Sequence, residues 1–254
     1  MGLSSRSYAP RGFSSDAIPP GVKWLVIVNA AVWLAYVAAD LTGAGALFRW
    51  MALVPRHVLG GRIWELATYL FLHSASDVGH ILINMLMLWM FGANLERSWG
   101  TRYFLRYYFL CGVGAALCVI AVSYLFTGNT GGATLGASGA IFGLLLAFGV
   151  VFAESTILFM FMFPMKAKYA VAIFGAIEFF YTIRSSGDGV SHIAHMGGML
   201  FGLVYLRARS TRRPVRATTS TASIGQRLRG AYKQWKIQRA KKQFEVYLRK
   251  HRDE

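Results

Sequence analysis

The chain has 254 residues, of which 55% are hydrophobic and 15% charged, with 27 Lys and Arg against 11 Asp and Glu. Soluble globular domains carry about 25% charged residues, so this composition excludes an ordinary soluble domain, and its apolar content excludes a disordered chain. Residues 207–254 contain 15 of the basic side chains. An apolar body with a basic tail fits a nucleic-acid-binding domain poorly, and we expect no nucleic-acid partner.

Composition divides the chain into three segments. Residues 1–22 are rich in Ser, Pro and Gly and lack an apolar core, which predicts a flexible cytoplasmic N-terminus without a signal peptide. Residues 23–208 hold the apolar runs and form the expected membrane domain. Residues 209–254 are basic, with apolar residues at helical spacing. This tail is either an amphipathic helix on the anionic lipids of the inner leaflet or a solvated segment that only fixes topology.

Six charge-poor runs, each near the roughly 20 residues needed to cross a bilayer, follow one another along the chain. They are 24–39, 78–95, 107–126, 138–153, 169–183 and 190–206. Backbone polar groups in lipid need partners within their own segment, so the runs predict an all-α polytopic membrane protein built as a six-helix bundle. Residues 154–168 contain Glu154, Pro164 and two lysines, which favours an interfacial connector over an extension of the fourth helix.

The distribution of Lys and Arg predicts which way the helices face. With a cytoplasmic N-terminus, segments on the inner side hold 23 basic residues and segments on the outer side hold 4. We therefore expect both termini in the cytoplasm of a prokaryotic cell and a multi-pass protein of its inner membrane. The second, fourth and sixth helices then begin at the outer side. This places His80, Asn84, Ser138 and His195 in the outer half of the membrane, where costly polar side chains mark function.

Ser138 is the candidate nucleophile, because it opens the fourth helix directly after a glycine-rich segment ending at Gly136. Glycine permits the positive φ that a loop dipping into the membrane requires. The run 138–153 would span about 24 Å as a helix, less than the hydrocarbon core, which predicts a water-filled depression above its start. Unpaired N–H groups and the helix dipole at that start can stabilise an oxyanion.

His195 is the candidate general base. Small residues would let the two helices approach until the serine hydroxyl reaches the imidazole. These are Gly139 and Gly143 on the fourth helix and Gly198 and Gly202 on the sixth. The pattern therefore predicts a site shared by two helices that lie far apart in the sequence.

Other side chains are expected to support this pair. Phe142, one turn after the serine, is expected to pack on the imidazole. The helix of His195 offers no acidic residue, and Asp188 lies seven positions earlier, so a Ser–His dyad is expected rather than a triad. His80 and Asn84, four residues apart on one helix face, would donate hydrogen bonds to the oxyanion.

The remaining polar and sulfur-bearing residues receive structural interpretations. His73 and His192 are expected to be structural or loop polar groups. Glu178, inside the fifth run, is either a gating or proton-relay group or a hydrogen-bonding partner of a neighbouring helix. Cys111 and Cys118, seven residues apart on a helix, are too distant for a disulfide.

Rival protease chemistries lack their motifs. A zinc protease would need His-Glu-x-x-His, which does not occur. An aspartyl type would need two intramembrane aspartates, whereas Asp188 is expected in a loop and has no partner. The soluble-hydrolase elbow G-x-S-x-G fails at Ala140. We expect neither a metal nor a cofactor.

Taken together, these residues resemble the rhomboid family of intramembrane serine proteases, in its compact six-helix bacterial form. The matching motifs, within residues 20–208, are Gly136-Ala137-Ser138-Gly139, Ala194-His195-Met196-Gly197-Gly198 with Gly202, His80-Ile81-Leu82-Ile83-Asn84, and Gly92, Glu96 and Gly100. The resemblance implies a Ser138/His195 dyad and an oxyanion hole made by the Ser138 N–H, His80 and Asn84. It also implies substrates that are transmembrane segments of other membrane proteins, cut near the outer face.

One departure and one alternative function accompany this resemblance. Many bacterial members carry a Trp-Arg pair in the first external loop, whereas Trp64 is followed here by Glu65. The alternative function is a non-catalytic rhomboid-like protein that binds membrane clients, or more remotely a small transporter. Inactive relatives lose the serine or the histidine, and both are present here.

Overall fold

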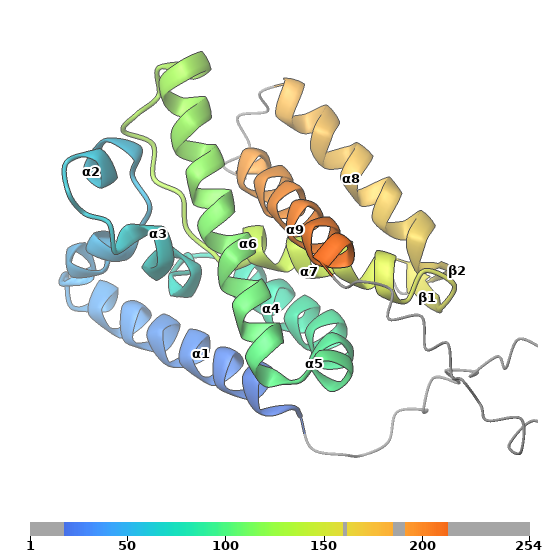
Figure 1. Ribbon diagram of the computed structural model, residues 1–254. Helices are drawn as coiled ribbons and strands as arrows, with labels where there is room; N and C mark the ends of the chain where they lie inside the picture. Colours follow the sequence, from blue (N-terminus) through green and yellow to red (C-terminus); the bar gives the residue numbers. More distant parts are fainter. Residues whose placement is uncertain (1–17, 160–161, 185–190, 213–254) are drawn as a thin grey trace, which may run out of the picture. The chain divides into compact units, whose positions relative to one another are not determined.

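The computed structural model describes residues 18–159, 162–184 and 191–212. The predicted N-terminal segment up to residue 17, Asp188 and the basic tail from residue 213 lie outside the described residues. The described residues up to Ala208 form one compact unit, a bundle of helices (Figure 1).

A helix occupies each of the six predicted runs. The first is α1 (Pro20–Leu41). The second is one continuous helix made of α4 (Val78–Met87), η3 (Leu88–Gly92) and α5 (Ala93–Trp99), and the third joins α6 (Thr101–Val122) to η4 (Ser123–Thr127). The last three are α7 (Ser138–Val151), α8 (Ala167–Arg184) and α9 (His192–Arg212). Among the described residues, three helical segments are long and apolar enough to cross a membrane: Pro20–Leu41, Val78–Trp99 and Thr101–Thr127. The helix Ser138–Val151 is apolar but shorter. The predicted all-α membrane bundle is confirmed, and the number of crossings stays a prediction.

The connector between α7 and α8 is a β-hairpin. Strands β1 (Thr156–Phe159) and β2 (Phe163–Lys166) pair antiparallel. The exposed Glu154 carboxylate, just before the hairpin, accepts hydrogen bonds from the ammonium groups of Lys166 and Lys168, which lower its pKa to about 2. The sequence predicted a connector here but not its strands, because the run shows no period-2 alternation.

Helix α7 is the centre of the bundle. It packs against α6, α8 and the long helix that contains η3, and most of its residues are buried. Glycines make these contacts close: a Cβ at Gly149 would lie 2.7 Å from the Val171 side chain on α8, and one at Gly143 would lie 2.6 Å from Cys111 Cβ on α6. The helix that carries the candidate nucleophile is therefore held rigidly on several sides.

The start of α1 is capped by a carboxylate from a distant helix. Glu96 of α5, 3% exposed, accepts hydrogen bonds from the backbone N–H groups of Gly21 (2.7 Å) and Val22 (2.8 Å) and from Thr101 Oγ1 (2.7 Å). The two N–H groups belong to the first turn of α1, where no helical carbonyl is available to them. The negative charge also complements the dipole of α1.

We expect Glu96→Gln to lower the free energy of unfolding by about 3 kcal/mol, because an amide cannot accept all three hydrogen bonds and removes the charge. Denaturant unfolding of the purified protein, followed by helicity, measures this loss. Thr101→Val is the control, since it removes one hydroxyl donor and leaves the α1 cap in place, with an expected loss of about 1 kcal/mol. Equal losses for the two variants would contradict the capping role.

Candidate functional site

The segment that leads to Ser138 is held by the loop between α1 and α4. Leu53 and Thr134 form an isolated antiparallel bridge, with N–H to oxygen distances of 2.9 and 2.8 Å. The N–H of Gly136 donates to the carbonyl of Tyr69 at 2.9 Å, and Gly136 has a φ of +112° that suits glycine alone. Ser138 follows as the first residue of α7 and is partly exposed.

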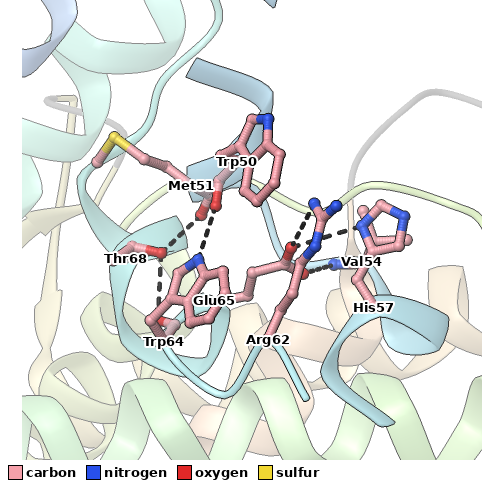
Figure 2. Close-up of polar contacts among 8 residues, drawn as sticks. All are labelled: Trp50, Met51, Val54, His57, Arg62, Trp64, Glu65 and Thr68. Atoms are coloured by element: carbon pink, nitrogen blue, oxygen red, sulfur yellow. Dashed lines mark hydrogen bonds and ion pairs between the residues drawn. The ribbon is translucent and has the colours of Figure 1, made fainter. Parts of the chain in front are cut away.

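The loop itself folds around the buried carboxylate of Glu65 (Figure 2). It contains η1 (Gly45–Met51), α2 (Pro55–Leu59), α3 (Glu65–Thr68) and η2 (Tyr69–Phe71). Glu65 is 0% exposed and accepts a 2.9 Å hydrogen bond from the N–H of Val54. Its other oxygen lies 3.4 Å from His57 Nδ1 and 3.7 Å from Arg62 Nη1. Val54 directly follows Leu53, which forms the bridge to Thr134. Glu65, the residue that departs from the family pattern, therefore anchors the segment that pairs with Thr134.

Trp50 and Trp64 connect separate parts of the same loop, as Figure 2 shows. The Trp64 indole N–H donates to the carbonyl of Trp50 at 3.1 Å, and the Arg62 guanidinium lies 3.9 Å above the Trp50 ring. Thr68 Oγ1 donates to the carbonyl of Met51 at 2.9 Å. These contacts give the loop a defined structure without a Trp-Arg pair.

His80 and Asn84 lie on α4 beside the start of α7. Asp77 caps this helix by accepting from the N–H of His80, and Asn84 Nδ2 donates to the carbonyl of His80 at 2.8 Å. An amide nitrogen has two N–H groups, so this bond does not exhaust its donors. A Cβ at Gly136 would lie 2.9 Å from His80 Nε2 and 4.0 Å from Ser138 Oγ, so the imidazole and the hydroxyl flank the same glycine.

The imidazole of His73 lies next to that of His80. The rings of His73 and His80 have centroids 5.1 Å apart, and His73 is fully buried. Neither nitrogen of His73 has a hydrogen-bond partner among the described residues. Burial, with the neighbouring His80, lowers the pKa of His73 to about 4, so this ring is neutral at pH 7.

The two helices of the predicted Ser–His pair touch through their glycines. A Cβ at Gly139 would lie 3.2 Å from the carbonyl oxygen of Ala194, and one at Gly198 would lie 2.7 Å from the carbonyl carbon of Gly139. The Phe142 ring stacks on the His195 imidazole, with centroids 4.2 Å apart and planes at 13°.

His195 is buried, and the part of the chain described here shows no hydrogen bond between it and Ser138 Oγ. Such bonds are often long in enzymes without substrate and tighten only when the complex forms. The backbone contact and the stacked ring therefore bring the two residues to neighbouring positions without completing their hydrogen bond.

The dyad was expected because the helix of His195 offers no acidic residue, but a carboxylate reaches His195 from another helix. Glu178 Oε2 on α8 lies 2.9 Å from His195 Nδ1 and 2.7 Å from His192 Nδ1. Glu178 is 8% exposed and His195 7%. The carboxylate comes from another helix, 17 residues earlier in the chain, so the residues around His195 do not reveal it. Of the two interpretations of Glu178, the structure shows the hydrogen bond to a neighbouring helix.

This cluster also contains the donor set of a small metal site, since the ligand atoms of Glu178, His192 and His195 all lie within 4.8 Å of one another. The spacing has a simpler explanation: both imidazole nitrogens are at hydrogen-bonding distance from one carboxylate oxygen. The Tyr181 ring stacks on His192, with centroids 5.0 Å apart.

Comparison with known proteins agrees with these motifs. The Rhomboid domain family model matches residues 60–212. Rhomboid-like protease 2 of Toxoplasma gondii is 29% identical over 198 residues, which cover 74% of this chain and 65% of that protein. Rhomboid protease AarA of Providencia stuartii is 30% identical over 193 residues, 70% of this chain and 68% of that protein. Rhomboid protein 1 of Saccharomyces cerevisiae mitochondria is 30% identical over 137 residues, but the match spans only 38% of its length.

Proposed function

The chain belongs to the rhomboid family and is an integral membrane protein, and on that premise we propose that it is an intramembrane serine endopeptidase. The observation that carries the proposal is the contact of α7 with α9. It sets the helix that begins at Ser138 directly against the turn that carries His195. Two helices that only packed for stability would not need an imidazole stacked on Phe142, the residue one turn after a helix-opening serine.

In the proposed mechanism, Ser138 Oγ attacks the carbonyl carbon of the scissile peptide while His195 takes the hydroxyl proton. The negative charge that develops on the carbonyl oxygen is stabilised by hydrogen bonds from the Ser138 N–H at the start of α7, from His80 and from Asn84. His195 then gives the proton to the leaving amine, and a water molecule releases the acyl group by the same route. These steps use the side chains and backbone of this protein together with one water molecule.

The proposed substrates are transmembrane segments of other membrane proteins, cut near the outer face. An intact helix hides its carbonyls in hydrogen bonds, so segments that unwind easily, with small residues at the cut, should be preferred. The excess of basic residues on the predicted inner side supports an orientation with both termini in the cytoplasm. A prokaryotic inner membrane is the proposed location.

Labelling with a serine-directed fluorophosphonate tests the nucleophile directly. We expect the purified protein to acquire one adduct, which peptide mapping assigns to Ser138, because a fluorophosphonate reacts only with an activated hydroxyl. His195→Ala should lose the adduct, since the base is gone. An adduct on another serine would contradict the role of Ser138 as nucleophile, and a Ser138 adduct that forms equally fast in His195→Ala would contradict the role of His195 as base.

A further inference from the structure

We propose that Glu178 is a positioning residue for His195, so that the reactive unit is Ser138–His195–Glu178 rather than a dyad. The inference rests on the proposed protease function and adds a member to its machinery. It starts from the 2.9 Å contact between Glu178 Oε2 and His195 Nδ1 across two helices.

The contact selects one form of the imidazole. An ionised carboxylate only accepts hydrogen bonds, so the nitrogen facing it must carry the proton. His195 is then protonated at Nδ1, and its Nε2 keeps a free lone pair on the opposite edge of the ring. This is the tautomer that can accept a proton from a serine hydroxyl.

Two contacts hold the ring in this orientation. The Glu178 carboxylate meets the Nδ1 edge, and the Phe142 ring covers one face at a centroid distance of 4.2 Å. The His192 Nδ1–H donates to the same carboxylate oxygen at 2.7 Å and helps to keep the carboxylate in place. The imidazole therefore has little freedom to rotate away from the start of α7.

The charge of Glu178 also matters during the reaction. When the serine O–H bond breaks, its proton moves to His195 Nε2 and the ring becomes an imidazolium. The carboxylate beside Nδ1 stabilises that positive charge, and in a site this buried the attraction is weakly screened. The carboxylate itself takes no proton.

A purely structural role, in which Glu178 only ties α8 to α9, makes a different prediction. It would lower stability on substitution without changing the chemical step selectively. The test is therefore kinetic: kcat and KM for a reporter transmembrane substrate, measured with purified full-length Glu178→Gln and with the parent. Melting temperature and helicity are recorded for every variant.

We expect Glu178→Gln to lower kcat by about 100-fold or more, with KM within about twofold of the parent, because Glu178 does not touch substrate. Thr182→Val is the matched control. Its hydroxyl donates to the backbone carbonyl of Glu178 at 2.7 Å, so it perturbs the same turn of α8 and spares the carboxylate. We expect its kcat to stay within about threefold of the parent.

The outcomes separate the two proposals. If Ser138→Ala is inactive and Glu178→Gln keeps the parent kcat, the positioning role is wrong and the protease function stands. If Ser138→Ala cuts as fast as the parent, the proposed serine protease mechanism itself is wrong. Should Glu178→Gln fail to fold, Glu178→Asp replaces it. That variant keeps the carboxylate but shortens the side chain by one methylene, which moves the charge away from His195 Nδ1. Its kcat should therefore fall about tenfold at constant KM, and an unchanged kcat would overturn the inference.

Discussion

Replacing Ser138 by Ala is expected to lower kcat for a reporter transmembrane substrate by about 10⁴- to 10⁶-fold. The variant removes the only atom that the proposed mechanism uses to attack the peptide carbonyl. The fold should not change, because α7 begins without a side-chain cap and its N-cap residue is Ala137. Cleavage of the reporter, followed by gel or by mass of the products, measures the loss.

An exposed serine in the loop before α4 offers the control for this experiment. Ser76 Oγ shares a 3.2 Å hydrogen bond with Ser74 Oγ, and Ser76→Ala removes only that surface contact. We expect Ser76→Ala to cut at the parent rate. Cleavage by Ser138→Ala at the same rate as Ser76→Ala would refute the role of Ser138 as the nucleophile.

Replacing Gly198 by Ala is expected to be the most damaging substitution for the fold. The added methyl would overlap the carbonyl oxygen of Gly139 and lie 2.7 Å from its carbonyl carbon. Both obstacles are backbone atoms of a helix enclosed on several sides, so α7 and α9 must separate. We expect a loss of about 3 kcal/mol or more in the free energy of unfolding. Cleavage should fall about 100-fold, because the serine and imidazole move apart.

Gly175→Ala is the matched control for this packing prediction. It also places a methyl between two helices, but the neighbours are Met199 Cε at 3.3 Å and Sδ at 3.9 Å, which belong to a flexible side chain. Alanine is also a better helix former than glycine by about 1 kcal/mol. Denaturant unfolding and reporter cleavage should therefore show Gly175→Ala close to the parent. Similar losses in both variants would show that any methyl between helices is disruptive.

Periodicity and composition identified the helices because each one must satisfy its own backbone and cover itself with apolar side chains in lipid. Those requirements are local, so they can be read from consecutive residues. The positions of Ser138, His195, His80 and Asn84 were also predicted, from polar residues that stand out in apolar runs. Their catalytic roles stay predictions until the variants above are measured.

Contacts between segments that are distant in the sequence decided which partners the buried carboxylates of Glu65 and Glu178 have. Glu65 departs from the family pattern, and only the folded loop shows its carboxylate accepting from the N–H of Val54, next to Leu53, which bridges to Thr134 in the segment before the serine. Glu178 could not be assigned to His195 from sequence, because the two lie on different helices and meet through packing. The sequence by itself determined which segments become helices and which polar side chains they carry. The tertiary structure alone decided which carboxylate faces which imidazole, since that depends on how helices rotate and cross rather than on any residue's neighbours along the chain.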